Sequence, residues 1–158
     1  MENWTTAIKR GLLSGGSASV LSTLALAAMG KRDTNSMFAP TNAVSHYVWG
    51  DKALKRNGLS LRYTLTGYLI HHASATFWGV LFERLIGRKL DNKSVAATLV
   101  TSAAATAVAC LTDHKLAPEP LQPGFEQRLS KPSLALVYGA FAVGLFAATV
   151  IIHRKQDR

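Results

Sequence analysis

Four long stretches without a charged residue dominate the hydrophobic pattern of this chain. Each is about 20 residues long, which is the length of helix that crosses a bilayer core of roughly 30 Å. None has the charged outer stripe that a helix of a soluble bundle shows. The pattern therefore predicts an all-α fold, an integral membrane bundle that forms a single transmembrane domain over residues 1–158. The four expected transmembrane helices cover about 11–30, 63–86, 94–112 and 133–153.

The connection between the first two spans, residues 31–62, is the longest one. Pro40 is a good first residue for a short helix, and Gly58 is a good stop. Tyr47 and Trp49 between them are residues of the kind that anchors a helix at a membrane surface. We therefore expect a short interfacial helix in the headgroup region. The alternative is an ordinary solvated helix within a loop.

Small residues recur at every fourth position in three of the spans. Faces of this kind let helices approach one another closely in a membrane. The third span consists mainly of Ala, Thr and Ser and has few leucines, so we expect it to pack on its neighbours over most of its surface and to lie centrally. The small-residue faces are Gly15, Ser19, Thr23 and Ala27 in the first span, Gly67, His71, Ala75 and Gly79 in the second, and Ala140, Gly144 and Ala148 in the fourth.

Composition adds a strong positive charge, +9 in 158 residues, although only 17% of the residues are charged. In a soluble protein this balance would suggest a nucleic-acid partner. Here Lys and Arg lie in the connections and the tail, where anionic lipid headgroups are the simpler partner. We expect the membrane lipid bilayer, other membrane helices or a second copy as partners, and no nucleic acid. The single cysteine, Cys110, excludes an intramolecular disulfide.

The orientation of the bundle is poorly determined by its charges. With four spans both termini share one side of the membrane. Each side then holds nine of the 18 Lys and Arg residues, so the count of positive charges is a tie. We expect cytoplasmic termini, because the charges on that side lie in shorter segments close to the helix ends.

A pair of histidines, His71 and His72, lies in the middle of the second span. An ionisable residue near the midplane is costly and by default indicates function. Because the first and third connections share a membrane side, His46, Asp113 and His114 gather at the end nearest this pair. Imidazole and carboxylate groups suit zinc, copper or iron. The candidate metal ligands are therefore His71, His72, His46, His114 and Asp113.

Other readings of the same histidines stay open. Two histidines within a bundle could hold a haem, and a histidine can relay protons. The simplest reading is that they form hydrogen bonds with Ser, Thr or backbone groups of neighbouring helices.

No catalytic motif accompanies these residues. The chain lacks HExxH, a phosphate-binding loop and a complete nucleophile elbow, so we do not expect an enzyme. The leading hypothesis is a non-enzymatic multi-pass membrane protein, an accessory or assembly partner in a membrane complex. The alternatives are a metal- or haem-binding redox membrane protein and a proton or ion conductor.

Two connections also carry a resemblance. The stretches APTNAVSHYVWGD and DHKLAPEPLQPGFEQRLS resemble segments of small, uncharacterised four-span inner-membrane proteins of proteobacteria. The resemblance covers about half of the chain and implies a bacterial plasma-membrane location. It implies no activity and no site residues. Elaborate connections of this kind are where a binding surface would be built.

Overall fold

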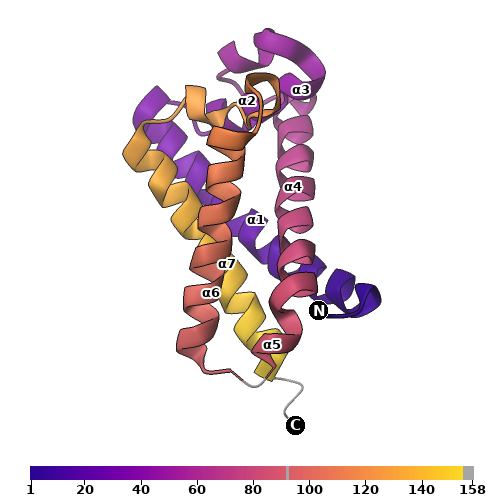
Figure 1. Cartoon of the computed structure of the whole chain (residues 1–158). Coiled ribbons are helices and arrows are strands. Elements are labelled where there is room, and N and C mark those ends of the chain that lie inside the picture. The colour runs from indigo at the N-terminus through magenta and orange to yellow at the C-terminus, as the bar shows by residue number, and fades with distance from the viewer. Residues whose placement is uncertain (92, 155–158) are drawn as a thin grey trace.

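The computed structural model describes residues 1–91 and 93–154, and every regular element within them is a helix (Figure 1). Long helices form the body, and short helical turns form most of the connections. The elements in chain order are α1 (Trp4–Thr34), α2 (Ala39–Val44), α3 (His46–Trp49), η1 (Gly50–Lys55), η2 (Leu61–Leu65), α4 (Thr66–Phe82), η3 (Glu83–Gly87), α5 (Arg88–Leu90), α6 (Val95–Leu111), η4 (Thr112–Leu116), η5 (Glu119–Leu121), η6 (Phe125–Gln127) and α7 (Lys131–Arg154).

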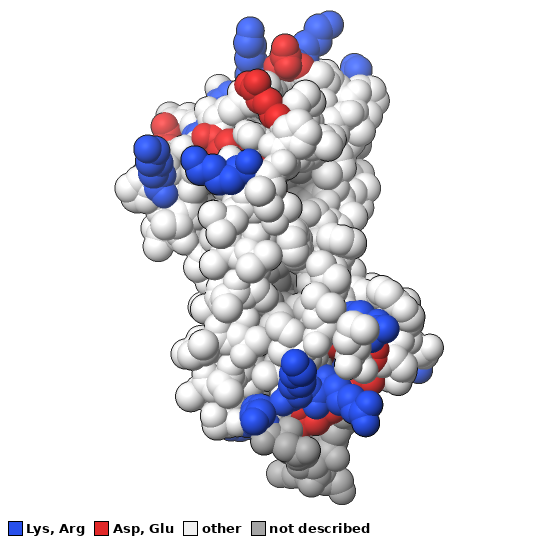
Figure 2. Space-filling model, viewed as in Figure 1, with Lys and Arg blue, Asp and Glu red and all other residues white. Residues whose placement is uncertain are grey.

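Three helices of the described chain are long and apolar enough to cross a membrane, namely Trp4–Thr34, Val95–Leu116 and Lys131–Arg154. They confirm the prediction of an all-helical protein with membrane-spanning helices. The helix α4, which carries both central histidines, is not among them. Figure 2 shows charged side chains gathered at the two ends of the molecule, with an uncharged belt between them. This distribution is typical of a protein whose middle lies in hydrocarbon.

The first helix is longer at both ends than its apolar stretch predicts. It begins at Trp4 because the side chain of Asn3 caps it, accepting a hydrogen bond from the backbone N–H of Thr6 at 2.9 Å. It ends before Asn35, which has a left-handed backbone with φ 56°. The extra turns therefore come from capping residues, which a hydrophobic pattern does not register.

The helix α1 lies at the centre of the bundle and packs against both α4 and α7. Small residues make these contacts. A Cβ atom added at Gly79 would lie 2.6 Å from the Cα of Gly15, and one added at Gly144 would lie 2.7 Å from the Cα of Ala18. The prediction that small-residue faces allow close helix contact is confirmed at Gly15, Gly79 and Gly144.

The prediction that the third span lies centrally is wrong. The helix α6 packs on α7 through one narrow face and scarcely contacts α1 or α4. Most of its apolar side chains are exposed, as Val100 and Leu111 illustrate. Scarcity of leucine did not identify a central helix, because alanine is tolerated equally well against lipid. The buried face of α6 consists of Thr98, Ser102, Thr106 and Ala109.

The connection after α1 is helical, but it contains three short helices instead of one. The chain turns at Ser45 between α2 and α3 and again at Gly50, whose φ is 63°. All six residues of α2 are buried, and Gly67 of α4 lies directly against the Thr41 carbonyl. The side chain of Asn42 holds the connection together, because it donates to the backbone carbonyls of residues 56 and 58. The α2 segment is therefore part of the bundle.

Candidate functional site

A cleft separates α4 from α6. The helix α4 packs on α1 and α6 packs on α7, and α4 and α6 scarcely contact each other (Figure 1). The cleft has a volume of about 450 Å³, and Figure 2 shows a recess in the uncharged belt at this level. Its size is within the range of small-molecule sites. Its lining comprises Ser22, Val44, Tyr47, Ile70, His71, Ala73, Ser74, Ala75, Phe77, Trp78, Ala109, Asp113, Leu121, Pro123, Phe125, Val137, Tyr138 and Phe141.

One wall of the cleft carries His71, whose Nε2 lies 2.8 Å from the hydroxyl of Ser22. That hydroxyl also lies 2.8 Å from the carbonyl oxygen of Ala18, which can only accept. A serine hydroxyl has a single proton to donate. Ser22 therefore donates to Ala18 and accepts from the Nε2–H of His71. This assignment leaves Nδ1 of His71 as the unprotonated ring nitrogen, an acceptor on a side chain that lines the cleft.

The opposite wall carries a second polar group, built on η4 and α7. The hydroxyl of Tyr138 donates to Oδ2 of Asp113 at 2.8 Å and lies 3.1 Å from Nε2 of His114. Because the hydroxyl proton is directed at the carboxylate, His114 donates to the tyrosine oxygen. Asp113 keeps its other carboxylate oxygen as a further acceptor. It occupies a wide turn that ends α6, a departure from regular helix that is common at functional sites.

Connecting segments close the cleft at this end. The hydroxyl of Tyr47 donates to the backbone carbonyl of Leu121 at 2.8 Å, which ties α3 to the second long connection. Partial burial, and then the charges of Asp113 and Glu126, raise the pKa of Tyr47 to about 12. The phenyl ring of Phe125 also lines the cleft, and its centroid lies 6.3 Å from the centroid of the His71 ring.

The other end of the cleft is apolar. Trp78 and Phe141 line both the main cleft and a second cavity of about 160 Å³ further along α4. The two cavities therefore follow the same gap between α4 and α6. The remaining residues of the second cavity are Leu81, Phe82, Leu85, Ile86, Ala105, Val108 and Leu145. The complete cleft is polar at one end and entirely apolar at the other.

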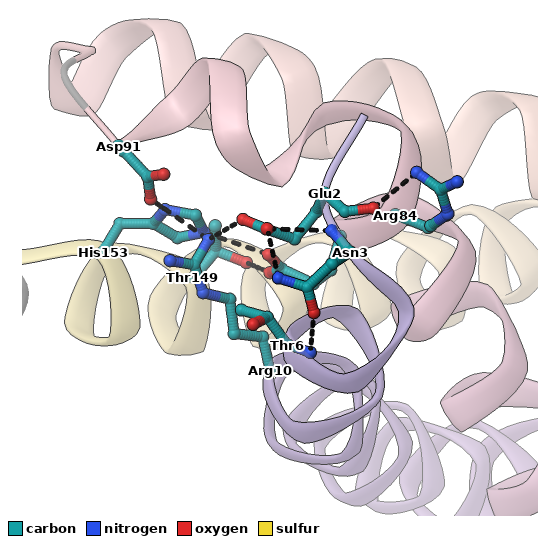
Figure 3. A network of polar contacts seen from close by, with 9 residues as sticks. Glu2, Asn3, Thr6, Arg10, Arg84, Asp91, Thr149 and His153 are labelled. Atoms are coloured by element: carbon teal, nitrogen blue, oxygen red, sulfur yellow. Dashed lines mark hydrogen bonds and ion pairs between the residues drawn. The ribbon is translucent and has the colours of Figure 1, made fainter.

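A separate polar cluster lies at the opposite end of the bundle, where the ends of α1, α4 and α7 meet (Figure 3). Glu83 is completely buried, and its carboxylate lies 3.0 Å from Nε2 of His153. The other ring nitrogen of His153 lies 2.7 Å from Asp91. Arg10, also buried, contacts Asp91 at 3.1 Å and Glu2 at 3.2 Å. The cluster joins residues from four separate parts of the chain and fixes this end of the bundle.

Sequence reasoning missed this second cluster. Arg10, Glu83 and His153 each lie at the end of an apolar stretch, where a charged residue is expected to face water or headgroups. The signal that could have found it is their common membrane side, since both termini and the second connection meet there. The contact between the buried Glu83 carboxylate and the His153 ring has a structural role, because each charge of the cluster lies beside an opposite charge.

The structure does not bring the five residues predicted as metal ligands together at one point. His72 lies on another face of α4 and bonds with the hydroxyl of Ser19 at 3.0 Å. Nδ1 of His46 donates to the Ala43 carbonyl at 3.0 Å. His71 and Asp113 line the cleft, while His114 lies behind Tyr138. Within residues 1–91 and 93–154, no three His, Cys, Asp or Glu side chains form a group that could hold a metal ion. The metal, haem and conduction hypotheses stay predictions.

Comparison of the chain with protein-family models, with curated proteins and with solved structures finds no match.

Proposed function

We propose that this protein is a non-enzymatic integral membrane protein that binds one amphiphilic molecule in the cleft between α4 and α6. The observation that carries this proposal is the division of the cleft into a polar end, with His71 and Asp113, and an apolar end beyond Trp78. An amphiphile has the same division. Its head would accept or donate hydrogen bonds at the first end, and its chain would fill the second.

The position of the cleft supports entry from the bilayer. Ser74 and Phe77 line it and are exposed on α4, so its mouth opens sideways within the uncharged belt. The proposal includes α4 with its flanking turns as a fourth span, antiparallel to its neighbours. We also propose that the connection around α3 lies in the headgroup region, where Trp49 and the polar end of the cleft would meet the lipid surface. The membrane would be the plasma membrane of a bacterium, with cytoplasmic termini.

The experiment compares two tryptophan substitutions on α4. Ser74→Trp places a large ring at the mouth of the cleft, whereas Leu69→Trp places it on an exposed position that does not line the cleft. The protein is purified in mild detergent and its bound molecules are identified by mass spectrometry. We expect one amphiphile per chain in the wild type and in Leu69→Trp, and its loss in Ser74→Trp. Equal, nonspecific lipid in all three would overturn the proposal.

A second candidate function is the accessory or assembly role that the sequence favours. The observation in its favour is α6, which packs mainly on α7 and leaves an apolar outer face that includes Val100 and Leu111. A helix of a partner protein could cover this face. Repeated purification from mild detergent should then return the same second protein. Recovery of this chain alone would count against the role.

A further inference from the structure

The polar end of the cleft also restricts the head group that it can take. This step rests on the proposed amphiphile site and asks which chemical class of lipid fits it. The groups that line this end are known in enough detail to separate hydrogen-bond donors from acceptors.

Apart from the Ser74 hydroxyl at the mouth, which can donate or accept, the polar side chains of this end offer acceptors to a ligand. The hydrogen bond to Ser22 uses the Nε2–H of His71 and leaves its Nδ1 as an acceptor. The carboxylate of Asp113 accepts from Tyr138 and has a second oxygen to accept with. The hydroxyl of Tyr47 already donates its proton to the Leu121 carbonyl. A head group that only accepts hydrogen bonds would therefore meet acceptors.

The charges at this end of the cleft also disfavour an acidic head group. Among the described residues that line the cleft there is no Lys or Arg, and Asp113 is the acidic one. A phosphate or carboxylate head would enter without a cation to balance it and would lie beside a carboxylate, and like charges brought together this way are strongly unfavourable. Figure 2 shows Lys and Arg side chains of this end on the outer surface of the molecule.

We infer that the cleft selects an amphiphile with an uncharged, hydroxyl-bearing head, of the diacylglycerol class. One hydroxyl donates to one acceptor and brings no charge that must be balanced. An ammonium head would pair with Asp113, but taking it out of water is costly, and ion pairing repays that cost only where all of its protons are bonded as well. The acyl chain runs past Trp78 into the apolar cavity, with the hydroxyl at His71 and Asp113.

The test is a competition followed by native mass spectrometry of the full chain in mild detergent. The probes are dioleoylglycerol and dioleoyl phosphatidic acid, which share two oleoyl chains and differ in the head, and oleylamine, which carries an amine on one C18 chain with the same double bond. We expect the glycerol lipid to exceed each of the others by about tenfold or more in occupancy. In Asp113→Asn the ratio of glycerol lipid to phosphatidic acid should fall towards one, because the repelling charge is removed. Glu119→Gln, an exposed carboxylate on the same connection that does not line the cleft, should leave the ratio unchanged.

The outcomes separate the two proposals. If phosphatidic acid or oleylamine binds as well as the glycerol lipid, and Ser74→Trp blocks that binding, the head-group inference is overturned and the amphiphile site stands. If Asp113→Asn leaves the ratio unchanged, the charge argument is overturned. If no probe binds in a way that Ser74→Trp abolishes, the proposed function fails with it.

Discussion

His71 on α4 donates a hydrogen bond to Ser22 on α1 across 2.8 Å, near the middle of the bundle. The bond holds the imidazole in one tautomer and directs its acceptor nitrogen away from α1. A histidine placed at this depth is expected to have a partner on a neighbouring helix. Here the partner is a serine that already donates to its own helix, and this fixes the direction of the bond.

The first prediction concerns this tautomer. Ser22→Ala removes the acceptor of the Nε2–H group, so we expect His71 to populate both neutral tautomers and the imidazole nitrogen resonances to shift in ¹⁵N NMR. The stability cost should be modest, about 0.6 kcal/mol, as for other interhelical hydrogen bonds in membranes. The matched control is Ser19→Ala, which removes the partner of His72 instead. Unchanged His71 resonances in Ser22→Ala would contradict the assignment.

The second prediction concerns the buried contact between Glu83 and His153 at the other end of the bundle. Glu83→Ala leaves the ring of His153 without its buried partner, so the free energy of unfolding should fall by about 3–5 kcal/mol. Glu119→Ala removes an exposed carboxylate and should cost less than about 1 kcal/mol. Denaturant unfolding in detergent micelles measures both variants.

A double-mutant cycle with His153→Ala then tests the pairing itself. The cost of removing both side chains should be clearly smaller than the sum of the two single costs, since the second removal no longer leaves a charge unpaired. Additive costs would show that Glu83 and His153 stabilise the fold independently.

The third prediction concerns the close approach of α1 and α4. A methyl group at Gly79 would overlap the backbone of Gly15, so Gly79→Ala should destabilise the protein by about 1–3 kcal/mol. The control is Gly139→Ala on α7, where an added Cβ meets open space. Its effect should be neutral or slightly stabilising, because alanine favours helix more than glycine by about 1 kcal/mol. Equal thermal stability of the two variants would refute this packing.

The fourth prediction concerns pH. The pKa of Tyr47 is raised to about 12 in the folded protein, against 10.0 for an ordinary tyrosine. Folding therefore favours the neutral phenol. The stability that Tyr47 contributes is fully present below the ordinary value and is lost as the pH rises through about 12. The difference in tyrosinate absorbance between the wild type and Tyr47→Phe should show one transition near this pH, and a transition near pH 10 would contradict it.

The helices were predictable because charge is excluded from hydrocarbon over a fixed length. That rule located the three helices that are long and apolar enough to cross a membrane, and the recurrence of small residues marked Gly15 and Gly79 as positions of close helix contact. It could not place α6, because alanine and threonine serve equally well in a helix interface and against lipid. The cleft exists because α6 lies at the edge of the bundle. A hydrophobic pattern does not indicate that position, so the cleft could not be predicted from the sequence.

The candidate site was predictable only in part. Topology brought His71 and Asp113 to the same end of the bundle, and both line the cleft. Which way each side chain points depends on packing, and the structure directs His72 to Ser19 and His114 to Tyr138. Tyr138 was missed because a tyrosine near the start of a span is usually an interfacial anchor. Its role depends on Asp113, which is distant in sequence.

Trp78 allows the most direct test of the amphiphile site, because it lines both parts of the cleft. The chain has three tryptophans, so Trp4→Phe with Trp49→Phe leaves Trp78 as the single reporter. This variant is placed in nanodiscs of unbrominated phospholipid, and diacylglycerol with brominated acyl chains is added as the quencher. A second variant that keeps Trp49 alone is the control. We expect saturable quenching of Trp78 that unlabelled diacylglycerol reverses, with no saturable component for Trp49. Quenching that rises in proportion to the added lipid, and equally for both tryptophans, would contradict an amphiphile site in the cleft.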